Sequence, residues 1–278
     1  MLNLMYITNN PDIAKIAEES GVNWIFVDME FIGKDARQRG LNTVQNNHTI
    51  EDIRRIKLAL SKAKVLVRIN SIHQNVEGYF DSKEEIDAAI EAGADILMLP
   101  YFFTLKEVEE FVGYVDGRVQ TCLLLETPEA ANLIDEILDI PGIDMIHIGL
   151  NDLHLAMGMK FMFQLLANGM VDLLASKIKA RGIPFGFGGV ANMHGGSLPG
   201  SYVLKEHYRL GSSMVIIGRS FCNTNVITDN SEIRKIFKYG IAELRDLETE
   251  IQNADAAYFD DNHKIVVEMV KNIVSETR

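Results

Sequence analysis

The sequence predicts an α/β protein, a (β/α)8 TIM barrel with additional C-terminal helices. Its length of 278 residues is enough for one such barrel, which typically needs about 250 residues. Eight short, nearly continuous apolar runs alternate with helical patterns, as in a parallel sheet covered by helices. We expect residues 1–221 to form the barrel and residues 222–278 to form a helical extension of the same domain.

The predicted strands share an apolar core and polar or glycine-containing ends. In chain order they are Leu2–Thr8, Trp24–Asp28, Val65–Ile69, residues 93–100, Leu123–Leu125, Ile143–Ile148, Ile183–Phe187 and Ser213–Ile217. Because parallel strands end at the same edge of a sheet, polar residues that follow them are expected to meet at one face.

Capping residues predict where several helices between the strands begin. The expected caps are Thr49, Thr127 before Pro128, and the capping boxes Ser82 to Glu85 and Thr104 to Glu107. One helix is expected to run from Thr127 to about Asp139. A long helical region is expected over residues 152–180, with breaks at Gly158 and Gly169.

Two further helices are expected after the barrel, over about residues 232–254 and 263–274. The first of these helices has an apolar face that consists of Ile233, Phe237, Ile241 and Leu244. An apolar face needs burial, so we expect both helices to pack on the barrel or on a second subunit.

The composition limits the classes of partner. A net charge of −12 argues against a nucleic-acid or anionic-membrane binder, so we expect neither partner. Cys122 and Cys222 do not make a disulfide framework, which favours a cytoplasmic protein. No segment resembles a transmembrane helix or a secretory leader.

Two carboxylates directly follow neighbouring predicted strands. The fifth strand stops at Glu126, and the sixth ends at Gly149 with Asp152 close behind. Carboxylate oxygens beside open coordination positions suit a hard cation such as Mg²⁺ or Mn²⁺. The alternative is that both residues only cap the helices that follow.

The segment around these carboxylates resembles the signature of the HpcH/HpaI aldolase and citrate lyase family. The similarity lies in ETPEA at residues 126–130, PGIDMIHIG at 141–149 and NDLHLAMG at 151–158. The resemblance implies a metal-dependent (β/α)8 barrel that makes or breaks a C–C bond next to an enolate. It also implies that Glu126 and Asp152 hold the metal. We expect Gly149, Leu150 and Asn151, which lie between the two carboxylates, to contact the substrate.

Arg68 ends the third strand and needs a partner or a ligand there. A guanidinium can hold a carboxylate in a bidentate fork. The resemblance implies this role for the Val67-Arg68 pair, with the carboxylate of a 2-oxo acid as ligand. The alternative is an internal salt bridge with Asp28 or Glu30.

The chain departs from the family pattern after the second strand. Members with aldolase activity often have Asp-x-Glu-His there, whereas this chain has Asp28, Met29, Glu30 and Phe31. Phe31 cannot transfer a proton. Asp28 and Glu30 remain catalytic candidates, and His48 in the long loop is the best-placed replacement for the missing histidine. A solvated loop histidine is the alternative.

Two other departures concern the fourth and fifth strands. Leu124 stands two residues before Glu126, where aldolases of the family often have Gln, and the Arg-Gly-rich loop after the fourth strand is absent. A standard pyruvate aldolase mechanism is therefore in question.

A glycine-rich segment, residues 186–200, begins in the seventh strand. Its backbone N–H groups could bind an anion, and Arg219 at the end of the eighth strand could add positive charge at a substrate-binding position. The alternative is a flexible loop. His147 and His154 flank the proposed metal motif, and we interpret both as hydrogen-bonded core histidines.

These observations predict a cytoplasmic, Mg²⁺- or Mn²⁺-dependent carbon–carbon lyase. Its substrate would be a 2-oxo acid or a related acyl compound cleaved through a metal-stabilised enolate, and a homo-oligomer is expected. Keto-acid aldolase and citramalyl- or malyl-CoA lyase types both remain open. The alternatives are a non-catalytic small-molecule-binding or partner barrel and a phosphoenolpyruvate-using relative.

Overall fold

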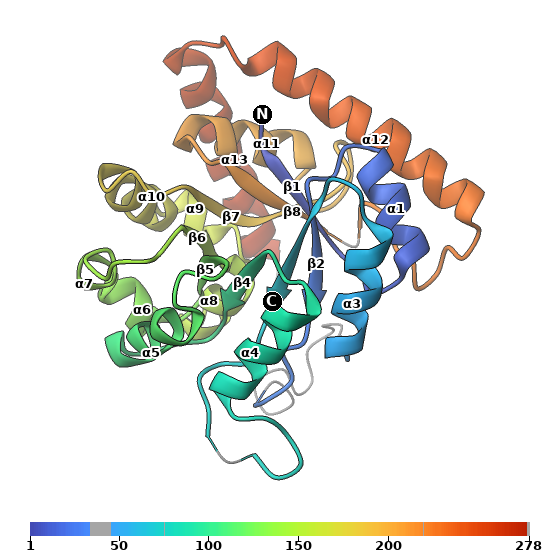
Figure 1. Ribbon diagram of the computed structural model, residues 1–278. Helices are drawn as coiled ribbons and strands as arrows, with labels where there is room; N and C mark the ends of the chain where they lie inside the picture. Colours follow the sequence, from blue (N-terminus) through green and yellow to red (C-terminus); the bar gives the residue numbers. More distant parts are fainter. Residues whose placement is uncertain (34–45, 75, 219, 277–278) are drawn as a thin grey trace.

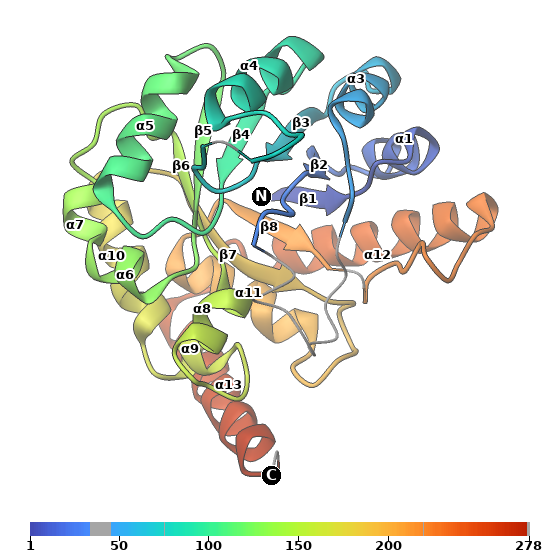
Figure 2. The same cartoon turned by 90° about the horizontal axis from the view of Figure 1, so that it is seen from below.

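Eight parallel strands close into a barrel in which each strand pairs with its neighbours in sequence order (Figures 1 and 2). The computed structural model describes residues 1–33, 46–74, 76–218 and 220–276. The strands are β1 (Asn3–Ile7), β2 (Trp24–Asp28), β3 (Lys64–Arg68), β4 (Ile96–Leu99), β5 (Gln120–Leu125), β6 (Met145–Ile148), β7 (Phe185–Val190) and β8 (Met214–Ile217). The predicted TIM-barrel fold with C-terminal helices is confirmed.

Helices surround the barrel on its outer side, as the view along the strands shows (Figure 2). The first group is α1 (Pro11–Glu19), α3 (Ile50–Ala59), α4 (Ser82–Ala92), α5 (Leu105–Val115), α6 (Pro128–Asn132) and α7 (Ile134–Ile137). The second group is α8 (Leu150–Ala156), α9 (Gln164–Ala167), α10 (Met170–Ala180), α11 (Gly200–Leu210), α12 (Asn230–Ile251) and α13 (Ala256–Glu276).

The strand positions agree with the prediction to within three residues at each end. β5 starts three residues earlier than predicted and β6 two residues later. β7 starts two residues later and extends three residues further, to Val190. The reason is its glycine content. A Cβ on Gly186 would lie 2.3 Å from the carbonyl oxygen of Met214 on the neighbouring strand. Glycine therefore allows an approach that no other residue permits, and the strand continues where the sequence suggested a loop.

The predicted helix caps are confirmed at three of four positions. Thr49, Thr104 and Thr127 each accept a hydrogen bond from the first turn of their helix. The predicted Ser82–Glu85 capping box is wrong, since Asp81 caps α4 together with Glu84.

Glu85 is instead fully buried and accepts hydrogen bonds from both nitrogens of Asn70, at 3.1 and 2.9 Å. The side chain of Ser82 turns back to accept the backbone N–H of His73 at 2.8 Å. Two adjacent candidates, Asp81 and Ser82, made the register of this cap ambiguous in the sequence.

The longer predicted helices are interrupted. The helix expected from Thr127 to Asp139 is divided into α6 and α7. The region expected over 152–180 forms α8, α9 and α10, with left-handed glycines at the predicted breaks, Gly158 (φ 68°) and Gly169 (φ 83°). These positions favour glycine because a Cβ is strained there.

The inside of the barrel holds its own apolar cluster, separate from the larger one between sheet and helices. Its buried members are Met5, Trp24, Phe26, Leu66, Ile96, Met98, Cys122, Leu124, Met145 and Met214. Side chains alternate along a strand, so the next inward position toward the carboxyl end of β2, β3 and β5 holds Asp28, Arg68 and Glu126. The interior therefore changes from apolar to charged at one end of the barrel.

The two C-terminal helices pack against the outside of the barrel. The predicted apolar face of α12 is buried at Ile233, Phe237, Ile241 and Leu244. α12 follows β8 and contacts both α1 and α11, so it occupies the eighth position in the helical layer. α13 packs on α9 and α11 and is the helix added to the eight βα units.

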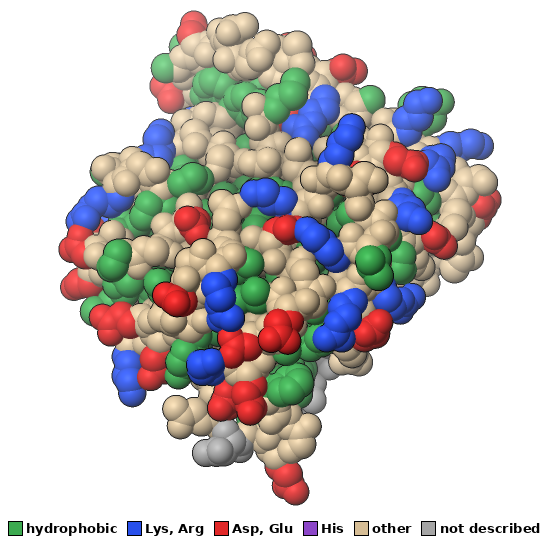
Figure 3. Space-filling view, in the orientation of Figure 1, with side chains coloured by type: hydrophobic (Ala, Val, Ile, Leu, Met, Phe, Trp, Pro, Cys, Tyr) green, Lys and Arg blue, Asp and Glu red, His purple; other side chains and the backbone are tan. Residues whose placement is uncertain are grey.

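Within the described residues, no helix has the length and apolarity needed to cross a membrane. On the face shown in Figure 3, acidic and basic side chains are interspersed.

A buried carboxylate, Glu248, joins α12 to the start of the barrel. It accepts the backbone N–H of Leu2 at 2.7 Å and the hydroxyl of Tyr208 at 3.1 Å, and it pairs with Arg245 at 2.5 Å. This carboxylate therefore anchors the helix in the position that covers β1.

We predict that Glu248→Ala lowers the free energy of unfolding by about 3 kcal/mol, because it leaves the N–H of Leu2 without its acceptor and Arg245 without its carboxylate partner. The matched control is Glu250→Ala, which removes an exposed carboxylate from the same helix. Urea unfolding monitored by circular dichroism measures both. Equal small losses in the two variants would show that the Glu248 contacts do not anchor the helix.

Candidate active site

A cavity of about 560 Å³ opens at the end of the barrel where the strands finish. Most of the predicted site residues line it. These are Asp28, His48, Arg68, Glu126, Gly149, Leu150, Asn151 and Asp152. Glu30 is not among the lining residues but contacts two of them, Arg68 and Asp28. Arg219 lies outside the described residues. The barrel therefore brings together side chains that are up to 124 positions apart in sequence, from Asp28 to Asp152.

Arg68 sits in a buried ion cluster at the cavity wall. Its Nε and Nη2 donate to the two carboxylate oxygens of Asp28, both at 2.8 Å, and its Nη1 lies 3.3 Å from Glu30. Burial acts to lower the pKa of Arg68, but Asp28 and Glu30 outweigh it and hold the pKa well above its ordinary value. The internal salt bridge, which the sequence left as the alternative, is thus present with both carboxylates.

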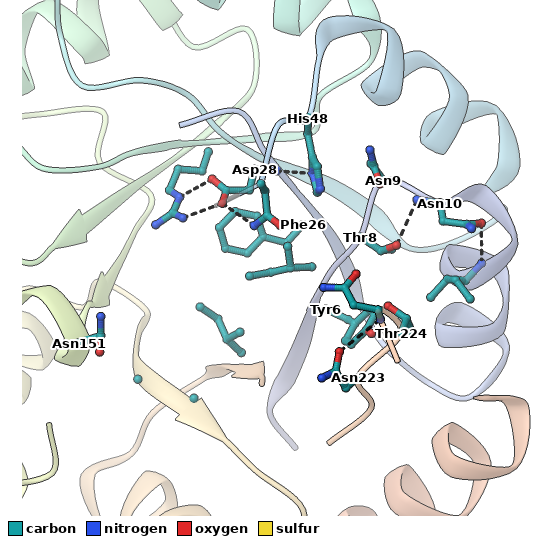
Figure 4. A pocket seen from close by; sticks show the side chains of 18 of the residues that line it. Tyr6, Thr8, Asn9, Asn10, Phe26, Asp28, His48, Asn151, Asn223 and Thr224 are labelled. Carbon is teal, nitrogen blue, oxygen red and sulfur yellow. Dashed lines mark hydrogen bonds and ion pairs between the residues drawn. The ribbon is translucent and has the colours of Figure 1, made fainter. Parts of the chain in front are cut away.

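The cluster also fixes the hydrogen-bonding state of His48. The backbone N–H of Asp28 donates to Nδ1 of His48 at 2.9 Å, and Asn46 donates to Oδ2 of Asp28 at 2.8 Å (Figure 4). Because Nδ1 accepts a hydrogen bond, neutral His48 carries its proton on Nε2. Adding a second proton at Nδ1 would break the bond to Asp28.

Glu126 and Asp152 come from neighbouring strands, as predicted. Glu126 is 3% exposed and accepts the backbone N–H of Tyr101 at 3.0 Å. Asp152 is half-buried in the first turn of α8. Both line the cavity, so the structure brings the two predicted metal ligands to the same opening.

Space beside Glu126 depends on a glycine. A Cβ on Gly149 would lie 2.9 Å from Oε2 of Glu126 and 2.8 Å from its Cβ. Among the residues that the structure describes, no three His, Cys, Asp or Glu side chains are arranged to hold a metal ion. A cation held by Glu126 and Asp152 would therefore have to take its other ligands from water or substrate oxygens.

The three residues between the two carboxylates, Gly149, Leu150 and Asn151, differ in what they present to the cavity. The N–H of Gly149 donates to the carbonyl of Leu125 at 2.9 Å, and Leu150 is buried. Asn151 is exposed at the edge of the cavity. Of the three residues expected to contact the substrate, Asn151 has the most available polar side chain.

The glycine-rich segment 186–200 reaches the cavity at Gly188 and Gly189, which lie within β7. Gly195 instead packs on Asn192, where a Cβ would meet Oδ1 at 2.5 Å. A Cβ on Gly200 would lie 2.7 Å from the carbonyl oxygen of Ala191. The close packing of the later glycines explains their presence without an anion.

Phe31 and Leu124 confirm that two polar groups of the family pattern are absent. Phe31 is 43% exposed and contacts Tyr79 edge to face at 4.8 Å between ring centroids. Leu124 lies in the barrel interior at the base of the cavity.

The two histidines near the metal motif are buried, as predicted. Nδ1 of His154 lies 3.1 Å from the carbonyl of Leu150. Nε2 of His147 lies 3.0 Å from the carbonyl of Gly188, but its Nδ1 has no hydrogen-bond partner. His147 is therefore only half hydrogen-bonded, and it also lines the cavity.

One side of the cavity was missed in the sequence. Asn and Thr side chains that follow β1 and β8 line it. Part of the signal was available in the polar run TNN at residues 8–10, which directly follows β1. The run NTN at 223–225 begins six residues after the end of β8.

Comparisons with known proteins identify similar sequences and folds. A profile of the family HpcH/HpaI aldolase/citrate lyase matches residues 3–163. A comparison with curated protein sequences gave no match.

Three solved structures share the fold. An HpcH/HpaI aldolase from Desulfitobacterium hafniense DCB-2 has 17% identity and a TM-score of 0.58, covering 78% of this chain and 86% of its own. A family protein from Burkholderia cenocepacia J2315 has 15% identity and a TM-score of 0.60, covering 84% and 94%. The citrate synthase SbnG has 14% identity and a TM-score of 0.60, covering 84% and 92%.

We predict a pH effect on stability from His147. Burial lowers its pKa to about 4, whereas an unfolded histidine has a pKa of about 6.5. The unfolded chain therefore binds this proton first, and the free energy of unfolding falls as the pH drops from about 6.5 to about 4. The slope from this residue approaches about 1.4 kcal/mol per pH unit.

His147→Gln keeps a side-chain N–H for Gly188 but cannot titrate, so its slope in urea unfolding should be smaller by about that amount. His194→Gln, which changes an 83% exposed histidine, is the control. Parallel pH profiles for His147→Gln and the wild type would contradict the prediction.

Proposed function

Because the chain belongs to the HpcH/HpaI aldolase/citrate lyase family, we propose that it is a divalent-metal-dependent carbon–carbon lyase acting on a 2-oxo acid or a related acyl substrate. The observation that carries the proposal is that Glu126 and Asp152 line one cavity together with Arg68.

The charge of the cavity supports a requirement for a cation. Its described ionised side chains are three carboxylates, Asp28, Glu126 and Asp152, and one guanidinium, Arg68, giving a formal charge of −2. An anionic 2-oxo acid would be repelled by this excess. A bound Mg²⁺ or Mn²⁺ would neutralise it and would supply positive charge to the enolate oxygen that develops in the reaction.

In this proposal, Arg68 binds the carboxylate of the substrate. Its guanidinium is held by Asp28 and Glu30 and is 14% exposed, so its position is fixed before a ligand arrives. Such preorganisation reduces the cost of ordering a side chain on binding. Asp28 and Glu30 then serve to position Arg68, in place of the acid–base role that the sequence left open.

His48 has a different role from the missing histidine of the family pattern. With Nδ1 accepting the N–H of Asp28, the neutral ring carries its hydrogen on Nε2. A neutral imidazole can stabilise negative charge on a substrate oxygen through this hydrogen bond without transferring the proton. We propose that His48 stabilises the alkoxide formed at the carbon whose bond is cleaved.

The metal-ligand proposal predicts that Glu126→Gln and Asp152→Asn each weaken Mg²⁺ and Mn²⁺ binding by at least about tenfold, since each removes a charged oxygen ligand. Titration calorimetry measures the affinity. Glu129→Gln, which neutralises an exposed carboxylate of α6, is the matched control. Unchanged binding in both site variants would remove the metal site, and a protein that binds no cation would favour the non-catalytic alternative.

The hydrogen-bond role of His48 predicts unequal effects of two substitutions. His48→Gln retains a side-chain N–H and should keep more of the retro-aldol rate than His48→Ala, which should lose about 100-fold, the loss typical of one oxyanion donor. Oxaloacetate decarboxylation releases CO2 and leaves the pyruvate enolate without forming an alkoxide, so both variants should affect it less. Equal losses for Gln and Ala in the retro-aldol assay would instead indicate that His48 transfers a proton.

A further inference from the structure

We propose that His147 is a positioning residue, which fixes a bulge in β7 and, through that bulge, the first turn of α8. This turn carries Asp152, so His147 acts on the metal site without touching the metal. Only this last step rests on the proposed function, because that function makes Asp152 a metal ligand. The effect of His147 on the position of α8 is independent of it.

The bulge lies where β7 pairs with β8. Between the paired positions Gly186 and Gly189, β7 has two residues, whereas β8 has only Val215 in the same interval. The second of the two, Gly188, has a φ of 49°, in the left-handed region that favours glycine. A bulge leaves its extra residue outside the ladder of hydrogen bonds, so the backbone groups of that residue need other partners.

His147 supplies such a partner from β6, on the other side of β7. Its Nε2 lies 3.0 Å from the carbonyl oxygen of Gly188, and since a carbonyl can only accept, Nε2 carries the hydrogen. His147 pairs in register with Gly186, so its side chain reaches two residues along β7 to make this contact. The imidazole is 1% exposed, so packing holds the donor in place.

The other ring nitrogen shows that stability of the interior does not explain the histidine. Nδ1 is buried and has no hydrogen-bond partner among the residues that the structure describes. A buried polar atom without a partner costs free energy. An apolar side chain would avoid this cost, as Met145 does at the previous inward position of β6. The contact with Gly188 is therefore what a histidine adds at this position.

The bulge in turn packs against the start of α8. A Cβ on Gly188 would lie 2.8 Å from Cδ1 of Leu150, so the bulge is in close contact with the first residue of that helix. α8 packs on β7 and α9 (Figure 2). It follows Gly149, which has no side chain to cap it. Packing against the bulge therefore sets the position of the first turn and of Asp152 within it.

Substitutions at His147 separate the hydrogen bond from the packing. His147→Gln retains a side-chain N–H for the carbonyl, whereas His147→Met and His147→Leu fill the interior and remove the donor. Amide hydrogen exchange of the full-length protein, followed by mass spectrometry of a peptide covering α8, reports how firmly that helix is held. The Met and Leu variants should speed exchange there by about tenfold, and His147→Gln by less than about twofold, as expected for one hydrogen bond.

Mn²⁺ affinity, measured by titration calorimetry, tests the consequence for Asp152. His147→Met should weaken binding by about threefold to tenfold, and His147→Gln should stay within about twofold of the wild type. Met145→Leu, a volume-conserving change at the previous inward position of β6, is the matched control. It should change neither the exchange of α8 nor the affinity.

Three results would overturn the positioning role: unchanged exchange of α8 in the variants without a donor, equally fast exchange in His147→Gln, or the same acceleration in Met145→Leu. Faster exchange with unchanged Mn²⁺ affinity, in a protein whose wild type binds Mn²⁺, would overturn the step to Asp152. A wild type that binds no Mn²⁺ would instead remove the proposed metal site, and hydrogen exchange would still decide the role of His147.

Discussion

The geometry of the site depends on the ion pairs that the buried guanidinium of Arg68 forms with Asp28 and Glu30. Parallel pairing of β2 with β3 sets Asp28 directly beside Arg68, and the bidentate contact follows from that register. Burying a cation costs free energy unless it is paired, so the carboxylates of Asp28 and Glu30 offset the cost of burying Arg68. The same Asp28 sets the tautomer of His48 through its backbone N–H. Register, charge and hydrogen-bonding state are therefore linked.

The apolar interior of the barrel limits the access of water to the charged groups at its mouth. The apolar layer that includes Phe26, Leu66 and Leu124 lies one inward position below Asp28, Arg68 and Glu126. It forms a floor that keeps the charges at the mouth and limits their solvation. Electrostatic interactions at this edge are stronger than at an open surface, which favours a cation between acidic side chains.

Much of this arrangement could be predicted from the sequence because strand ends are readable. Asp28, Arg68 and Glu126 directly follow or end clear apolar runs, and parallel strands bring such positions to one face. The cap of α4 was misplaced since Asp81 and Ser82 offer the same chemistry at adjacent positions. β7 was misplaced because its glycines suggested a loop, whereas they allow close contact with β8.

Other features depend on contacts between residues far apart in the chain. The tautomer of His48 follows from a hydrogen bond to a residue 20 positions away in the chain. Nδ1 of His147, which has no hydrogen-bond partner among the described residues, faces Gly186 on the neighbouring strand. Neither is visible in a local pattern. The side of the cavity lined by Asn and Thr was overlooked because these residues also commonly begin turns. Their common position becomes apparent only when the pairing of β1 with β8 is known.

The central claim is that a divalent cation held by Glu126 and Asp152 would stabilise the enolate that forms in the reaction. Exchange of the pyruvate methyl protons for deuterium, followed by NMR in D2O, tests it most directly because no second organic reactant is needed. Solvent takes the methyl proton, and the stabilised enolate then takes up deuterium from D2O. The account predicts that the wild type exchanges these protons only with added Mg²⁺ or Mn²⁺, and that Glu126→Gln loses the exchange while Glu129→Gln keeps it. Exchange at the same rate with a chelator present, or in Glu126→Gln, would contradict it.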